Sequence, residues 1–323
     1  MSGVAAFARW PRRLQVGAAG LTLLALAAVA GPWFTANPNA IVDARAAALL
    51  PPGATRFVLV RHDGTTMACE SGRRTGAEWV VTRDGAVQTV PAATVASAGV
   101  RRFWLGTDTV GRDVLARLVS GARVSLGVGA LALVVALVLG IGAGLVAGWT
   151  GGVVDALLMR FVDALLAVPM LFLLLFLAAV FRPSLGVLVL ILGFSSWMGV
   201  ARLVRGQVLS LKEREFILAA RAIGASGWRI AFTHLLPNAL TPIVQDGALR
   251  LGDLILVEAA LSYLGLGAQP PTASWGTMVA EGQEVLASTW WLTMLPTALI
   301  AATVIAAALA ADGVQELARR EQT

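Results

Sequence analysis

The chain is poor in the side chains that build disulfide and zinc frameworks. Its 323 residues include one cysteine, Cys69, and two histidines. A single thiol excludes an intramolecular disulfide, and three such side chains cannot supply the four Cys and His ligands of a structural zinc site. The sequence therefore predicts a fold without a crosslink and without a bound metal.

Charge is scarce as well. Charged residues make up 14% of the chain and hydrophobic residues 57%, whereas an ordinary soluble domain has about 25% charged residues. Five or six apolar runs reach the ~20 residues that a helix needs to cross a bilayer. The run 131–139 lacks the alternating polar residues of a barrel strand, so helices must satisfy the backbone. The predicted fold class is an all-α integral membrane protein.

The net charge of +6 raises the question of nucleic acid. The arginines are spread along the loops and do not gather in one patch, so nucleic-acid binding is not predicted. Lysine occurs once, at Lys212, within Leu-Lys-Glu. A phosphate-binding P-loop needs Gly-Lys followed by Ser or Thr. The spans also lack a convergent set of nucleophile, base or metal ligands. We therefore expect neither an enzyme nor an ATP-binding chain, and no cofactor bound by this chain.

The first apolar run extends from Leu14 to Phe34 and follows Arg12 and Arg13. It fits a signal peptide, for which Ala28-Val29-Ala30 offers a cleavage-like site, or a first membrane anchor. Its length and the many later spans favour the anchor. Residues 1–34 are then a cytoplasmic N-terminus and a first transmembrane helix.

A long polar segment follows at 35–105. Two short runs rich in Val, Phe or Trp, at 56–61 and 77–82, are closely followed by Asp63-Gly64 and Asp84-Gly85. Asp-Gly is a strong hairpin signal because glycine readily takes positive φ. We predict one or two β-hairpins in a small external module between the first two helices. This module is either a docking surface for a partner or a spacer over the bundle.

Five further apolar runs predict five more spans. They cover about 124–149, 153–181, 184–209, 236–266 and 290–311. Six spans leave both chain ends on one side of the membrane. The basic stretch 202–234 and the Arg319-Arg320 tail then fall on the cytoplasmic side, as the positive-inside rule requires. The predicted core is 106–312, with a cytoplasmic tail at 313–323.

The loop 210–237 has the pattern of a small amphipathic helix. Phe216, Ala219, Ala220 and Ile223 are spaced i, i+3, i+4 and i+7 and share one face. Gly224 is a helix stop, and the serine at 226 is placed to cap a second short helix. A stripe of small residues lets a partner backbone approach closely, with Phe216 as an anchor. The alternative is a helix lying on lipid headgroups.

This loop resembles the cytoplasmic coupling loop of ABC-importer permeases. The pattern there is Glu-Ala-Ala, three residues, Gly, and Leu-Pro about a dozen positions later. Ala219, Ala220, Gly224 and Leu236-Pro237 match it, while Leu218 stands at the glutamate position. The resemblance implies that this loop contacts an ATPase subunit. The matched and neighbouring residues are candidates for that coupling: Glu215, Phe216, Ala219, Ala220, Ile223, Gly224, Ala225 and Pro237.

Two further segments, Leu105–Leu118 and Leu261–Gly276, resemble the permeases of dipeptide, oligopeptide and nickel importers, specifically the second of their two paired subunits. The resemblance covers about 101–312 and implies a six-transmembrane-helix type I importer permease in the bacterial inner membrane. It further implies a second homologous permease subunit, two ATPase subunits that bind ATP and Mg, and an extracytoplasmic solute-binding protein. The rival functions are a secondary transporter, whose inverted repeats are not seen here, and a channel.

Two sets of polar residues are further candidates. Thr107 or Asp108 could cap a short helix 110–118 that has Asp113 in its first turn. This helix is either an outer collar for the binding protein or an interfacial helix that orients span two. The collar candidates are Gly106, Thr107, Asp108, Gly111, Arg112 and Asp113.

Within the spans, Glu258 and Asp163 are candidates for the translocation path or its gate, because charges inside a membrane mostly face a bundle interior or a water path. For Glu258 the alternative is an interhelical hydrogen bond that fixes packing. Asp246 and Arg250 are spaced i, i+4 and should form an ion pair.

Overall fold

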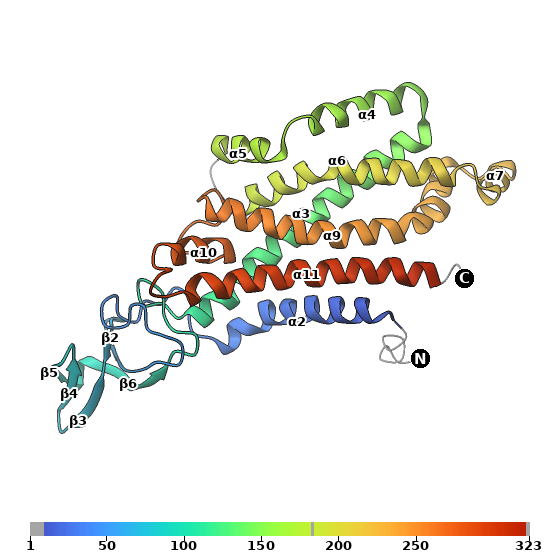
Figure 1. Cartoon of the computed structure of the whole chain (residues 1–323). Helices are drawn as coiled ribbons and strands as arrows, with labels where there is room; N and C mark the ends of the chain where they lie inside the picture. Colours follow the sequence, from blue (N-terminus) through green and yellow to red (C-terminus); the bar gives the residue numbers. More distant parts are fainter. Residues whose placement is uncertain (1–9, 182–183, 321–323) are drawn as a thin grey trace. The chain divides into compact units, whose positions relative to one another are not determined.

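The structure is a computed structural model that describes residues 10–181 and 184–320. The ends of the predicted cytoplasmic segments, 1–9 and 321–323, lie outside the described residues. The chain divides into two compact units. The first comprises 1–24, 125–267 and 300–323, and the second comprises 25–124 and 268–299. Helices α2, α3 and α11 contribute residues to both units (Figure 1).

Most of the chain is helical, as predicted. Four helices are long and apolar enough to cross a membrane: α2 (Arg12–Phe34), α3 (Val114–Thr150), α6 (Leu185–Leu211) and α11 (Trp291–Arg320). Helix α9 (Leu236–Tyr263) has 28 residues but carries Asp246, Arg250, Asp253 and Glu258. The shorter elements are α4 (Gly152–Leu166), α5 (Met170–Val180), α7 (Glu215–Ala222), α8 (Gly227–Ile230), the π-helical turn η2 (Ala231–Leu235) and α10 (Trp275–Gln283).

The span predicted at 153–181 consists of two helices, and whether they cross the membrane as one span stays a prediction. The helix stops at Leu166 and begins again at Met170. Proline has no N–H to donate, and its ring disfavours the helical conformation of the preceding residue. Pro169 therefore interrupts the helix after Val168 and forms the N-cap of α5.

Helices α3 and α6 meet along a seam of glycines in the first unit. Gly140, Gly144 and Gly148 recur every four residues. A Cβ atom on Gly140 would lie 2.4 Å from Cβ of Val200, and one on Gly144 would lie 2.6 Å from the carbonyl oxygen of Ala201. Small residues at this spacing let two membrane helices approach backbone to backbone. Helix α9 lies beside α6 on this unit (Figure 1).

A second glycine contact joins α2 to α11 in the same unit. A Cβ atom on Gly17 would lie 2.4 Å from the backbone nitrogen of Ala310, and one on Gly313 would lie 2.3 Å from the backbone nitrogen of Leu14. The ends of both helices are also linked by an ion pair between Arg13 and Asp312 at 3.3 Å. The N-terminal helix is thus packed tightly against the C-terminal one.

The second unit contains six strands in two antiparallel three-stranded sheets. The orders are β2-β1-β6 and β3-β4-β5. The strands are β1 (Thr55–Arg61), β2 (Thr66–Cys69), β3 (Ser71–Thr75), β4 (Glu78–Arg83), β5 (Ala86–Pro91) and β6 (Val95–Arg102), with a 3₁₀ turn η1 (Ala92–Thr94) before β6. The predicted segment 35–105 thus belongs to a larger unit that also holds α10.

Both Asp-Gly pairs lie in hairpin connections. Asp84 and Gly85, with φ of 52° and 74°, join β4 to β5 in a two-residue turn. Positive φ at both positions is what a type I′ turn requires. Asp63-Gly64 lies in the longer β1–β2 connection. A third hairpin, β3–β4, turns at Gly76 with φ of 62° and was not predicted.

The two sheets share a small apolar core. Leu59, Cys69, Val81 and Val90 are buried together, with the ring of Phe57 packed against its edge. Burial raises the pKa of the Cys69 thiol, because an apolar environment disfavours the thiolate. This cysteine is a structural residue of the module.

Asp43 ties the chain before β1 to the sheets. Its carboxylate accepts hydrogen bonds from the backbone N–H groups of Arg45, Ala46 and Ala68 at 3.0–3.2 Å, and it pairs with Arg83 at 3.0 Å. Burial alone would raise the pKa of this carboxyl, but the three N–H donors and the Arg83 charge outweigh burial and lower it.

Candidate functional site

One face of helix α7 packs against the rest of the first unit. Ile217 and Ala220 are buried in an apolar cluster that includes Val204, Ile230 and Leu235. Their i, i+3 spacing puts both side chains on the same face. The helix is therefore fixed through this face to α6 and to the segment leading into α9.

The exposed side of α7 carries Phe216, Leu218 and Ala219, and the C-cap residue Ile223 is 85% exposed. The expectation that Ala220 belongs to the exposed stripe was wrong, since it is 7% exposed. Its methyl group packs in the same apolar cluster as Ile217. An apolar patch of this kind on a projecting helix is typical of a protein docking surface.

The end of α7 is shaped by Gly224, whose φ is +82°. Its N–H donates to the carbonyl of Arg221 at 2.9 Å, and the N–H of Ala225 donates to the carbonyl of Ala220 at 3.1 Å. These two bonds form a Schellman motif, which favours glycine at the left-handed position. Ser226 then accepts a hydrogen bond from the N–H of Arg229 at the start of α8, so both predicted helix boundaries are confirmed.

Side chains around α7 connect it to the end of α3. The guanidinium of Arg221 lies 4.5 Å over the ring of Trp149, within the range of a cation–π contact. Lys212 donates to the carbonyl of Gly148 at 3.2 Å. The ring of Phe216 meets that of His234 edge to face at 6.4 Å. Pro237 lies in the first turn of α9 and is exposed. The coupling candidates thus gather in one region around α7 and the start of α9.

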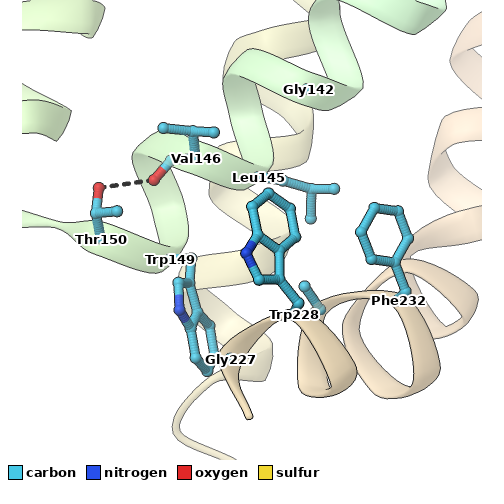
Figure 2. A pocket seen from close by; sticks show the side chains of 9 residues that line it. Gly142, Leu145, Val146, Trp149, Thr150, Gly227, Trp228 and Phe232 are labelled. Atoms are coloured by element: carbon cyan, nitrogen blue, oxygen red, sulfur yellow. Dashed lines mark hydrogen bonds between the residues drawn. The ribbon is translucent and has the colours of Figure 1, made fainter.

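An apolar cavity of about 350 Å³ lies beside this region. Figure 2 shows Trp228 and Phe232 facing the end of α3, with Trp149 and Leu145 on that helix. The rings of Trp228 and Phe232 are stacked with centroids 5.9 Å apart. Neither aromatic was singled out from the sequence, although both precede Leu236-Pro237 in a basic loop.

Three ion pairs involve charged residues of α4, α6 and α9. Asp246 pairs with Arg250 on α9, as predicted, and Arg250 also donates to the carbonyl of Ser196 at 3.2 Å. Asp163 pairs with Arg202 across α4 and α6, with both side chains more than half exposed. The third pair, Asp155 with Arg205, also joins α4 to α6. The path role of Asp163 stays a prediction.

Glu258 is 0% exposed in α9. The hydroxyl of Ser262, one turn later, donates to its carboxylate at 2.7 Å. This carboxyl is enclosed within the chain and does not reach the surface of the structure. The hydrogen bond with Ser262 is within α9, so the interhelical bond and the path or gating role of Glu258 both stay predictions.

The collar candidates form a compact loop in the second unit. The hydroxyl of Thr107 accepts from the N–H of Leu50 at 2.8 Å and donates to the carbonyl of Ala47. Gly106 and Gly111 have φ of +79° and +81°, and a Cβ on either would lie within 2.4 Å of a backbone oxygen. The loop is therefore held tightly against residues 43–50.

The predicted short helix at 110–118 was wrong. Helix α3 begins at Val114 and continues without a break to Thr150. Gly111 has a left-handed backbone, which no helix could contain. Asp113 accepts from the N–H groups of Leu115 and Ala116 at 3.0 and 3.3 Å, so this residue, and neither Thr107 nor Asp108, caps the helix.

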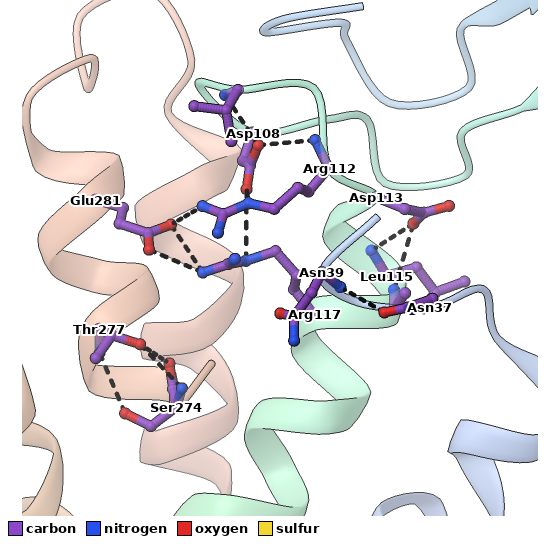
Figure 3. A network of polar contacts seen from close by, with 12 residues as sticks. Asn37, Asn39, Asp108, Arg112, Asp113, Leu115, Arg117, Ser274, Thr277 and Glu281 are labelled. Atoms are coloured by element: carbon purple, nitrogen blue, oxygen red, sulfur yellow. Dashed lines mark hydrogen bonds and ion pairs between the residues drawn. The ribbon is translucent and has the colours of Figure 1, made fainter. Parts of the chain in front are cut away.

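Asp108 instead belongs to a cluster of four charged residues (Figure 3). Nε of Arg112 donates to Asp108 at 2.6 Å, and Nη2 of Arg112 donates to Glu281 at 3.1 Å. Arg117, 1% exposed, donates through Nη2 to both carboxylate oxygens of Glu281 at 2.8 and 2.9 Å. Arg117 and Glu281 were missed from the sequence because the pair is separated by 164 residues.

Helix α10 holds Glu281 in place. Ser274 and Thr277 form a reciprocal capping box at its start, which Figure 3 shows beside the cluster. The indole N–H of Trp275 donates to the carbonyl of Leu118 at 3.0 Å. The Leu105–Leu118 and Leu261–Gly276 motifs therefore contact each other near the starts of α3 and α10.

Comparison with known proteins identifies the family. Residues 112–322 match the family of binding-protein-dependent transport system inner membrane components. The chain belongs to this family. It is a multi-pass inner-membrane component of a transport system. The permease family predicted from the coupling loop and the two other motifs is confirmed.

Individual relatives extend over about two thirds of each chain. The chain is 40% identical over 214 residues to the dipeptide transport system permease protein DppC of Bacillus subtilis, covering 66% of this chain and 67% of that protein. It is 38% identical over 213 residues to the oligopeptide permease OppC of the same organism, with 66% and 70% covered. For DppC of Escherichia coli the identity is 42% over 212 residues, with 66% and 71% covered.

Among solved structures, the chain is similar to an inward-facing conformation of the MetNI methionine ABC transporter. The match covers 61% of this chain and 96% of that chain, with 19% identity and a TM-score of 0.49. Residues 1–111, which include all six strands, lie outside the family match.

Proposed function

We propose that the chain is one of two permease subunits of an ATP-driven importer that moves peptides or related small solutes into the bacterial cytoplasm. The observation that carries the proposal is α7. This short helix is fixed by Ile217 and Ala220 and presents Phe216, Ala219 and Ile223 outward. It lies within the family match, in a chain whose one lysine is not in a P-loop.

Energy for transport then comes from a partner. ATPase subunits would close against α7, and the rigid attachment of α7 to α6 and α9 would convert that closure into movement of the spans. A helix that is packed on an apolar cluster through two buried residues transmits movement better than a mobile loop does, because close-packed interiors resist compression. ATP and Mg belong to these partner subunits, and this chain holds no part of the ATP site.

The proposed topology has six spans. The four apolar helices are joined by α9 and by the α4–α5 pair, which crosses as one span broken at Pro169. A membrane span can contain the four charged residues of α9 if they face the bundle interior and form pairs, as Asp246 and Arg250 do. Arg12, Arg13, Arg319 and Arg320 then lie on the cytoplasmic side together with α7, in keeping with the positive-inside rule.

The same topology places the β-sheets and the Asp108–Glu281 cluster outside. A solute-binding protein would dock on this side, and the loop 106–113 is a rigid candidate for its contact. A second, homologous permease subunit would complete the pore. The names of the relatives, dipeptide and oligopeptide permeases, support peptides as the solute class.

Reconstitution tests the proposal. The chain, its paired permease and the separately encoded ATPase subunits are purified, and ATP hydrolysis and peptide uptake are measured in proteoliposomes with the binding protein added. We expect hydrolysis stimulated by loaded binding protein only when all the subunits are present. Uptake by the lone chain without ATPase subunits would instead identify a secondary transporter or channel.

A further inference from the structure

The apolar cavity beside α7 has no role in the coupling described above. We call it the tryptophan cavity, and its aromatic walls are Trp149, Trp228 and Phe232 (Figure 2). Its volume of about 350 Å³ is within the range of small-ligand sites. The one hydroxyl in its wall, on Thr150, already donates its proton to the carbonyl of Val146 at 2.7 Å. An apolar cavity of this kind stays dry and accepts an apolar guest.

The depth of the cavity restricts the guest. Its wall on α3 runs from Gly142 to Thr150, about 12 Å along a helix that rises 1.5 Å per residue. These residues form the end of a helix that is long and apolar enough to span the membrane. An acyl chain of the bilayer would lie next to this apolar helix end, and this favours a lipid over a soluble protein domain as the guest.

Two arginines lie next to lining residues of the cavity, one by contact and one by sequence. Arg221 covers the ring of Trp149 at 4.5 Å, and Arg229 is the residue after Trp228 on α8. Both guanidinium groups are exposed, and neither forms an ion pair with a residue in 10–181 or 184–320. Two unpaired cations beside an apolar cavity favour an amphiphile with a negatively charged head.

We propose that the tryptophan cavity binds one acyl chain of an anionic phospholipid, whose phosphate is held by Arg221 and Arg229. In the proposed topology Trp149 is at the cytoplasmic end of α3, and tryptophan commonly settles at the headgroup level of a membrane. The bound lipid fills the space between α3 and α8 and so supports the base of the coupling helix.

Native mass spectrometry of the full-length chain tests this site. The protein is delipidated in detergent and titrated with phosphatidylglycerol or phosphatidylcholine of identical acyl chains. We expect preferential retention of phosphatidylglycerol. Arg221→Gln and Arg229→Gln should each weaken its binding about fivefold, the effect of one basic residue on an anionic lipid, and should leave phosphatidylcholine unchanged.

A cavity-filling variant tests the acyl-chain part of the site. Gly142 lines the cavity and has no atom within 4 Å of a Cβ position, so Gly142→Leu has open space where its side chain begins. We expect it to lose bound lipid of either headgroup. Gly127→Leu is the matched control, because Gly127 lies on the same helix with equally open space but outside the cavity. If Gly142→Leu does not fold, the two exposed arginine variants carry the test alone.

Three results would overturn the proposal. They are equal retention of the two lipids by the unmodified chain, arginine variants that bind phosphatidylglycerol normally, and a folded Gly142→Leu chain that retains lipid as before. If that last chain also fails to assemble with ATPase subunits, the cavity is a protein docking site. The lipid titration uses the chain without partners, so its outcome is independent of whether the chain couples to an ATPase.

Discussion

Nη2 of Arg117 donates to both carboxylate oxygens of Glu281, at 2.8 and 2.9 Å. The arginine is almost fully buried at the first turn of α3, and Glu281 is on α10. This pair links the Leu105–Leu118 motif to α10, the helix that begins at the end of the Leu261–Gly276 motif. It also gives the loop 106–113 a rigid base.

The first prediction concerns this ion pair. Glu281→Gln leaves the Arg117 guanidinium buried without its main counter-charge, which should cost about 3 kcal/mol of stability. The readout is the temperature at which Cys69 becomes reactive to a thiol-specific dye, because this thiol is 1% exposed and lies in the same unit. We expect a clearly lower temperature for the variant.

Two variants serve as controls for this prediction. Glu284→Gln removes the same charge from an exposed position on the same segment and should change little. Replacing both partners, by Arg117→Leu with Glu281→Leu, should recover much of the loss, since no unpaired charge remains. An unfolding temperature that is unchanged by Glu281→Gln would show that the pair does not stabilise this unit.

The second prediction concerns the glycine seam between α3 and α6. A side chain at Gly144 would meet the carbonyl oxygen of Ala201 at 2.6 Å and Cβ of Val204 at 2.7 Å. Neither the helix backbone nor the β-branched carbon can move aside cheaply. Gly144→Val should therefore destabilise the bundle by about 3 kcal/mol, near the upper end for overpacking. Thermal aggregation of the purified protein measures this loss.

Gly127→Val provides the comparison for the seam, because Gly127 lies on α3 with no atom within 4 Å of its Cβ position. A generic effect of valine in a helix would lower the stability of both variants equally. Only a packing effect specific to the seam separates them.

The third prediction concerns Gly224 and coupling. An L-residue in the left-handed conformation costs about 1–2 kcal/mol, and φ here is +82°. Gly224→Trp should leave membrane insertion intact and abolish transport-linked ATP hydrolysis, because the bulky side chain would project from the end of the docking helix. Gly224→Asn should retain most activity, since asparagine tolerates this conformation. Normal transport by Gly224→Trp would remove α7 from the coupling step.

Much of this fold could be predicted from local signals in the sequence. Apolar length alone located the long helices, and Asp-Gly pairs located two hairpins. The same sequence also held signals that were not used. Pro169 marks the break between α4 and α5, and Ser274 with Thr277 marks the start of α10. The four-residue spacing of Gly140, Gly144 and Gly148 indicates a close helix contact, which is the α3–α6 seam.

What the sequence could not supply were the contacts between distant segments. Phe216, Ala219 and Ala220 share a helical face by spacing, but only the neighbouring Ile230 and Leu235 decide that Ala220 is covered. The pairing of Arg117 with Glu281 depends in the same way on where α10 lies. A lone sequence gives the faces of a helix and does not say which of them another segment will bury.

The fourth prediction concerns pH and Asp43. The carboxylate accepts three backbone hydrogen bonds and pairs with Arg83, and its pKa is lowered in the folded module. A lowered pKa in the folded state adds stability above the unfolded value of about 3.9. That stability is lost as the pH falls through the folded pKa. The unit should therefore become less stable in acid, from about pH 4 downward.

Asp43→Asn tests this directly. The amide cannot carry the charge, so the variant should be less stable at pH 7 by about 2 kcal/mol, the scale of hydrogen bonds to a charged group. It should also lose most of the acid dependence that the unmodified chain shows. Trp79 lies on β4 next to the ring of Phe57, so a change in tryptophan fluorescence follows unfolding of the sheets at each pH. Glu70→Gln, exposed at the end of β2, should keep the normal pH dependence. If Asp43→Asn and the unmodified chain lose stability in parallel below pH 4, another group is responsible and the Asp43 network contributes nothing to acid sensitivity.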